Sequence, residues 1–125
     1  MSLRSPVGRA LGLGAAKEGV GHWWSQRISA VALVVLTLWF VTALLRLGTL
    51  EYAPLIVWIS DPVTAVLLVL LIGTLVHHSL LGVQVVVEDY VGGAAKVATL
   101  LASNFLHVAL GVLAVFAVLR IAFGR

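Results

Sequence analysis

The sequence contains no cysteine and little charge. Of its 125 residues, 62% are hydrophobic and only 10% are charged, whereas a typical soluble domain is about 25% charged. Without cysteine the chain cannot form a disulfide, a thiolate metal site or an iron–sulfur cluster of its own, so any redox chemistry must use a bound cofactor or a partner chain. This composition is typical of a membrane protein.

Dense basic patches are also missing. Eight Lys and Arg residues against five Asp and Glu give a net charge of +3, but these cations are spread along the chain instead of forming the clusters that bind phosphates. We therefore exclude nucleic acid as a partner. The few charges serve instead to indicate how the chain is oriented in the bilayer.

Three long uncharged runs lie between the charged residues. The first covers residues 28–45, the second residues 62–87 and the third residues 97–119, and a membrane-spanning helix needs about 20 residues. We predict an all-α membrane protein with transmembrane spans at 28–47, 62–87 and 97–119, joined by a loop at 47–61. Asp61 should cap the second span, with Pro62 in its first turn. Three helices make a thin bundle, so we expect partner helices to complete it.

Residues 1–27 differ from the rest of the chain. They contain four basic residues and one acid, and they are rich in glycine without a helical period. We predict a basic tail and interfacial segment at 1–27, with residues 7–21 extended, and a transmembrane domain at 28–125. Basic residues are more frequent on the side that holds the N-terminus. The positive-inside rule therefore places the N-terminus on the inner side of the membrane.

Three histidines fall inside the predicted spans, where an ionisable side chain must pair, face a cavity or bind a ligand. His77 and His78 are adjacent, so at about 100° per residue they should point to different faces of a helix. Gly82 follows His78 by four residues and Gly73 precedes His77 by four, so either face has room for a flat ligand. His107 lies at a similar depth. A bis-histidine haem between spans two and three, a haem shared with another subunit, and ordinary interhelical hydrogen bonds all remain open.

The inner end of span two carries Glu88, Asp89 and Tyr90. An aromatic residue and two solvated acids are common at a membrane interface. A phenol can also donate a hydrogen bond to a quinone carbonyl while a nearby carboxylate orients the ring or relays a proton. Both interpretations fit this position.

Two segments resemble a known family. His78, Gly82, Asp89 and Tyr90 form the pattern H-x3-G-x6-D-Y, which resembles the second-helix motif of the smaller cytochrome b membrane-anchor subunit of succinate dehydrogenase, respiratory complex II. The segment GHWWSQRISAVALVVLTLWF, residues 21–40, resembles the first-helix entry of bacterial members. The similarity extends over most of the chain from Lys17 onward.

The resemblance implies specific roles. His78 would be an axial ligand of the iron of haem b, with the second ligand from a larger cytochrome b anchor subunit. Tyr90 would bind ubiquinone with support from Asp89, and Arg27 would lie near a haem propionate. The resemblance leaves His107 as a structural residue and the roles of His22 and His77 open.

The family also implies partners and a location. Flavoprotein and iron–sulfur subunits would oxidise succinate, and this chain, not catalytic alone, would help to pass the electrons to the quinone pool. The bacterial inner membrane, with the N-terminus cytoplasmic, is the expected location, and the mitochondrial inner membrane is the alternative. Two other functions stay open: a structural anchor without haem, and a stand-alone cytochrome b that uses His78 and His107.

Overall fold

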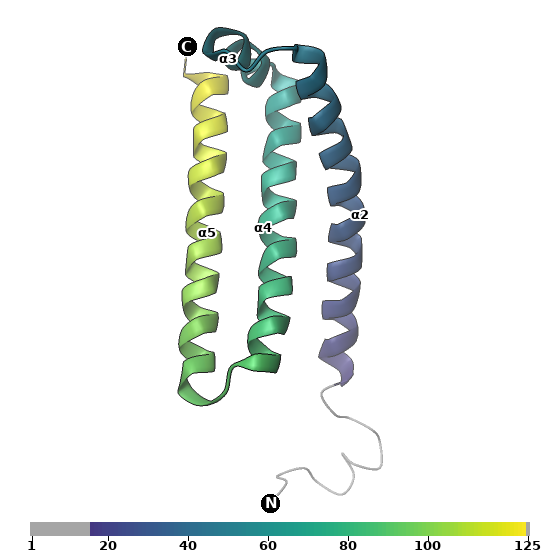
Figure 1. Cartoon of the computed structure of the whole chain (residues 1–125), viewed down its shortest axis with the longest axis vertical. Coiled ribbons are helices and arrows are strands. Elements are labelled where there is room, and N and C mark those ends of the chain that lie inside the picture. The colour runs from purple at the N-terminus through teal and green to yellow at the C-terminus, as the bar shows by residue number, and fades with distance from the viewer. Residues whose placement is uncertain (1–15, 125) are drawn as a thin grey trace, which may run out of the picture.

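The computed structural model describes residues 16–124. This part of the chain folds into four helices and no strand: α2 (Ala16–Leu47), α3 (Tyr52–Ser60), α4 (Pro62–Tyr90) and α5 (Gly93–Phe123). Figure 1 shows α2, α4 and α5 side by side, with the short α3 across one end. Within the described residues, Gly19–Leu47, Pro62–Tyr90 and Gly93–Phe123 are long and apolar enough to cross a membrane. The predicted all-α architecture with three transmembrane spans is confirmed.

The local sequence explains where the helices begin and end. The backbone N–H of Thr64 donates to Oδ2 of Asp61 at 2.9 Å, and Pro62 occupies the first turn of α4, as predicted for this cap. After α2, Gly48 adopts a φ of +69°, the left-handed conformation in which glycine commonly ends a helix. The connections between spans therefore begin at residues suited to them.

A short connection sets the direction of α5. Only Val91 and Gly92 separate α4 from α5, and a link of this length makes consecutive helices antiparallel neighbours. The Nζ of Lys96 donates to the backbone carbonyl of Glu88 at 2.8 Å, which places a cation beside the C-terminal carbonyls of α4. The Lys96–Glu88 hydrogen bond thus stabilises the turn between α4 and α5.

Helix α4 is the central element. It packs against α2 on one side and against α5 on the other, so α2 and α5 flank it as outer helices (Figure 1). The α2–α4 interface and the α4–α5 interface are therefore distinct surfaces of the same helix. Each of them carries histidine.

The buried apolar core is small and lies toward the α3 end. Ala65, Leu68 and Val118 form it, and aromatic rings from α2 and α3 pack around it. Trp39 and Trp58 stack with their ring centroids 6.2 Å apart. This aromatic group joins α3 to the long helices and fixes the closed end of the bundle.

The rest of the apolar surface is uncovered. No large side chain is fully buried within the described residues, and Phe105 and Leu45 are 78% and 75% exposed. Apolar surface on this scale must be covered by lipid or by other helices. The prediction of a thin bundle without a large enclosed core is confirmed.

Two boundaries differ from the predictions. Helix α2 begins at Ala16, so the predicted extended conformation is wrong for residues 16–21; residues 1–15 of the predicted tail lie outside the described part. Lengthening an existing helix adds a hydrogen bond for each residue without a new nucleus, which offsets the cost of the glycines at 19 and 21. The predicted loop at 47–61 contains α3, whose packing against the aromatic group stabilises a helix too short to form alone.

Candidate functional site

The α2–α4 interface is polar near the start of span one, and both adjacent histidines of α4 contact α2 there. Nε2 of His77 lies 2.8 Å from Oγ of Ser25, and Nδ1 of His78 lies 2.9 Å from Oγ of Ser29. Ser25 and Ser29 are one helical turn apart. The two imidazoles thus diverge, as adjacent helical side chains must, yet both reach the same neighbouring helix.

The hydrogen-bond neighbours of His78 favour one tautomer. The hydroxyl of Ser29 donates its single hydrogen to the backbone carbonyl of Gln26 at 3.0 Å. With that hydrogen on Gln26 the Ser29 oxygen accepts from Nδ1 of His78, and the Gln26 amide nitrogen, which can only donate, faces Nε2, so both contacts favour the tautomer with the proton on Nδ1 and the lone pair on Nε2. The Nε2 atom has one neighbour, Nε2 of the Gln26 side-chain amide, at 3.4 Å, beyond the usual length of an N–H hydrogen bond.

Two unpaired polar atoms lie on α2, one of them on the Gln26 side chain that contacts His78. Nε2 of His22 and Oε1 of Gln26 are buried and have no hydrogen-bond partner within the described part of the chain, although buried polar groups are nearly always paired. A Cβ added at Gly82 would meet only Nε2 of Gln26, at 3.7 Å. The interface therefore combines unused hydrogen-bonding capacity with open space one turn from His78.

These features fit a haem ligand. A histidine that binds iron through Nε2 keeps its proton on Nδ1 and donates it to an oxygen, which orients the ring and raises its basicity. The contacts of His78 fit this arrangement, and at Gly82 only the Gln26 amide comes within 4 Å of an added Cβ. No group of three or more His, Cys, Asp and Glu side chains gathers among residues 16–124, so a metal here would depend on the porphyrin and on a ligand from elsewhere.

His107 belongs to the other interface. Its Nδ1 donates to the backbone carbonyl of Ser103 at 2.8 Å, and its Nε2 accepts from Oγ of Ser79, on α4, at 3.0 Å. Both ring nitrogens are thus engaged, and the predicted hydrogen bond between helices is present. His78 faces α2, whereas His107 reaches α4 from α5. The two histidines therefore lie on opposite sides of α4. This arrangement does not favour a haem ligated by both.

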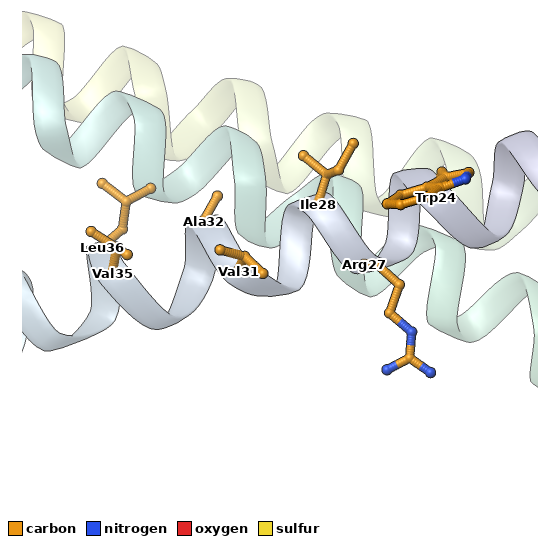
Figure 2. Close-up of a pocket in the computed structure, with 7 residues that line it drawn as sticks. All are labelled: Trp24, Arg27, Ile28, Val31, Ala32, Val35 and Leu36. Atoms are coloured by element: carbon orange, nitrogen blue, oxygen red, sulfur yellow. The ribbon is translucent and has the colours of Figure 1, made fainter.

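Arg27 lies outside the α2–α4 contact. Its guanidinium carbon is 5.4 Å from the ring centroid of Trp23, and Figure 2 shows its side chain extending away from the helix into open space. Arg27 stands at the end of a shallow apolar groove on α2 that is lined by Trp24, Ile28, Val31, Ala32, Val35 and Leu36. No hydrogen bond joins Arg27 to His78 within the described residues.

The C-terminal end of α4 is exposed. Tyr90 is 85% exposed, Asp89 is exposed beside it, and Nε2 of Gln84 donates to Oε1 of Glu88 at 2.8 Å. The structure therefore presents Asp89 and Tyr90 together at the helix end but does not bring them to His78. Twelve residues of helix, about 18 Å, separate Tyr90 from His78.

Sequence reasoning missed the two residues that contact His78. Gln26 and Ser29 lie three residues apart at the start of span one, where polar residues at helical spacing could have indicated a polar face toward a neighbouring helix. Nothing in the sequence alone pairs that face with His78 rather than with His107.

Comparisons with known proteins agree with these observations. Residues 1–119 match the family described as succinate dehydrogenase/fumarate reductase transmembrane subunit. The chain is similar to the succinate dehydrogenase hydrophobic membrane anchor subunit of Rickettsia bellii, at 35% identity over 89 residues, 70% of each chain. It is also similar to that of Paracoccus denitrificans, at 32% identity over 120 residues, 96% of this chain and 93% of the relative.

No solved structure matches the chain. The bacterial relatives and the three apolar helices together support a bacterial membrane protein. The family match covers all three of those helices except the last turn of α5. The chain therefore belongs to the succinate dehydrogenase/fumarate reductase transmembrane subunit family, the membrane anchor subunits of complex II.

Proposed function

We propose that this chain anchors succinate dehydrogenase in the bacterial inner membrane, with its N-terminus cytoplasmic, and that it helps to bind haem b and ubiquinone. The larger cytochrome b anchor subunit, the iron–sulfur subunit and the flavoprotein subunit are its proposed partners. The observation that carries the proposal is the environment of His78: a histidine inside a span, with Nδ1–H donated to Ser29 and Nε2 weakly engaged.

His78 is the proposed axial ligand. Its Nε2 lone pair would bind the iron, and the Gln26 amide, 3.4 Å away, would give way, because a contact of that length is weak. The second axial histidine would come from the larger anchor subunit, since His107 has both ring nitrogens occupied. When bound, haem b supplies a one-electron carrier whose potential depends on its axial ligands and their hydrogen bonds.

Arg27 is the proposed partner of a haem propionate. It follows Gln26 directly in α2, and its guanidinium is exposed and shares no hydrogen bond with a carboxylate among the described residues. An arginine can hold a carboxylate through two parallel hydrogen bonds. In this role it would fix the edge of the haem at the inner side of the membrane, where span one begins.

Asp89 and Tyr90 are the proposed quinone-binding residues. The Tyr90 hydroxyl is exposed and can donate a hydrogen bond to a ubiquinone carbonyl, which draws electron density toward the oxygen that will be protonated. The Asp89 carboxylate lies next to it at the membrane surface, where it can take protons from water and pass them on. Both residues would act while electrons arrive from succinate through the partner subunits.

One observation favours a second candidate, an anchor without haem. Both nitrogens of His78 have a neighbour within this chain, Ser29 for Nδ1 and Gln26 for Nε2. A neutral imidazole in that position is a satisfactory interhelical contact without iron. The stand-alone cytochrome is not favoured, because His78 and His107 serve different interfaces.

A Tyr90→Phe variant of the whole purified complex tests the quinone part of the proposal. We expect succinate to reduce a b-type haem in both proteins, as read from the reduced-minus-oxidised visible spectrum. Ubiquinone reduction should fall by about 100-fold in the variant, because loss of a positioned proton donor costs about that much. Tyr52→Phe, at the opposite end of the bundle, is the matched control and should reduce quinone at the wild-type rate. Wild-type quinone reduction in Tyr90→Phe would remove Tyr90 from the site.

A further inference from the structure

We propose that Ser29 is the positioning residue for His78, holding the imidazole in the one tautomer that can bind iron. Its hydroxyl accepts from Nδ1 of His78 at 2.9 Å and donates to the Gln26 carbonyl at 3.0 Å. The inference rests on the proposed function, because an iron-binding tautomer matters only if His78 binds iron. It gives α2 a part in haem binding beyond packing.

Burial is the first argument. Ser29 is only 5% exposed, in a molecule whose helices are otherwise largely open to lipid. Burial of a hydroxyl is costly unless its hydrogen-bonding capacity is used, and in Ser29 the hydrogen and one lone pair both have partners. The position is therefore built around a polar interaction, since an apolar residue would serve packing alone at no such cost.

The direction of the hydrogen bonds is the second argument. The Gln26 carbonyl can take the hydrogen of Ser29, which leaves the Ser29 oxygen to accept from Nδ1 of His78, and the Gln26 amide nitrogen, a donor, faces Nε2, so the contacts agree on one tautomer. The opposite tautomer, with the proton on Nε2, would place the Nδ1 lone pair against the Ser29 oxygen and would leave no lone pair at Nε2 for iron. The hydrogen bonds from His78 to Ser29 and from Ser29 to the Gln26 carbonyl thus favour the tautomer of His78 that can bind iron through Nε2.

The neighbouring histidine supplies a contrast. Oγ of Ser25 lies 2.8 Å from Nε2 of His77, but His77 is exposed, and this contact uses the nitrogen that in His78 is the one available to iron. The structure gives Ser25 no backbone acceptor that would fix the direction of this bond. Ser25 and Ser29 are the same residue type on the same helix and the same interface, so they form a matched pair for mutation.

Haem chemistry gives the expected consequence. A hydrogen bond from Nδ1–H increases electron donation from Nε2 to the metal, and loss of such an outer-shell partner costs about 10-fold or more in affinity. Stronger donation favours the ferric state, so removal of the acceptor should raise the midpoint potential of the haem. It should also loosen the orientation of the ring, which changes the low-spin electron paramagnetic resonance signal.

The experiment uses the whole purified complex with Ser29→Ala, Ser29→Thr and Ser25→Ala. We expect Ser29→Ala to bind haem about 10-fold more weakly, to raise the midpoint potential in a redox titration and to shift the low-spin signal. Ser29→Thr keeps the hydroxyl and should restore all three properties, and Ser25→Ala should match the wild type. Co-purification of the other subunits shows whether each variant assembles.

Two results would overturn the positioning role while leaving the haem proposal intact: a wild-type potential and signal in Ser29→Ala, or Ser29→Thr behaving like Ser29→Ala. The second would mean that the side-chain volume, and not the hydroxyl, matters. A His78→Ala complex that keeps its low-spin haem would instead remove the proposed function itself, and the role of Ser29 with it.

Discussion

The two faces of α4 use histidine in different ways. At the α4–α5 interface, His107 has its Nδ1 proton on the Ser103 carbonyl and its Nε2 lone pair bound to the Ser79 hydroxyl at 3.0 Å. At the α2–α4 interface, the contacts of His78 favour the same tautomer, but among the described residues the hydrogen-bond partner of Nε2 is the Gln26 amide, at 3.4 Å. His107 has one nitrogen bonded within α5 and the other to α4, whereas His78 has a nitrogen whose contact is long enough to be displaced.

If His78 binds haem as proposed, depth and residue type do not distinguish a ligand from a histidine that only forms hydrogen bonds. Both imidazoles lie inside apolar helices, and both keep their proton on Nδ1. What separates them is the length of the contact to Nε2 and the neighbouring side chain, since Gln26, which contacts His78, has a buried Oε1 without a hydrogen-bond partner among the described residues. A functional site is therefore indicated by incomplete pairing, which the partner or cofactor would complete.

Blocking the open surface beside His78 should have the largest effect. Gly82→Leu would fill the space one turn from His78, where only the Gln26 amide is near, and should reduce the haem content of the purified complex to background. Gly73→Leu is the control, because Gly73 lies on the α5 side of α4 with nothing within 4 Å of an added Cβ. Haem content per complex is measured from the absorption spectrum. If both variants kept their haem, the assignment of the haem to the α2 side of α4 would be contradicted.

A glycine on the α5 side should affect stability and leave the spectrum unchanged. A Cβ at Gly111 would lie 3.1 Å from Cγ2 of Val76, and a β-branched side chain in a helix has little freedom to move. Overpacking costs about 1–3 kcal/mol, more than the roughly 1 kcal/mol that alanine gains over glycine in a helix. Gly111→Ala should thus lower the thermal midpoint of the complex, and adding Val76→Ala should restore it. An unchanged midpoint would mean that α4 and α5 separate easily.

The smallest expected effect concerns the N-terminal cap of α4. The backbone N–H of Thr64 donates to Asp61 and holds the pKa of this carboxyl below its ordinary value. A carboxyl with a lowered pKa stabilises the folded state above its unfolded pKa, about 3.9, and loses that contribution as the pH falls through the lower folded value. Asp61→Ala should lower the thermal midpoint slightly at pH 6, and the difference from wild type should shrink below pH 4. A constant difference would exclude the charge as its cause.

Much of the fold could be predicted from the sequence, because span length, charge distribution and caps are local properties. The uncharged runs located all three long helices, and Asp61 and Pro62 located the start of α4. The helical extension of α2 to Ala16 and the helix α3 could not be predicted in this way. Both depend on contacts or on continuity with a neighbouring helix, which outweigh weak local preferences.

The candidate site was predictable only in part. An ionisable residue in a span singles out His77, His78 and His107, and the H-x3-G-x6-D-Y resemblance selects His78 from these. Ser29 and Gln26, which contact His78, precede it by 49 and 52 residues. No local sequence pattern determines which helix packs against His78. The roles of Arg27, Asp89 and Tyr90 stay predictions, because their proposed ligands and partner subunits lie outside this chain.

The most direct test of the central claim is chemical rescue of the proposed axial ligand. We predict that His78→Gly abolishes the low-spin b-type haem spectrum of the purified complex, and that added imidazole, entering the space left by the side chain, restores it. His107→Gly should keep the low-spin spectrum without imidazole. A His78→Gly complex that retains its low-spin haem, or a His107→Gly complex that loses it and regains it with imidazole, would contradict the account.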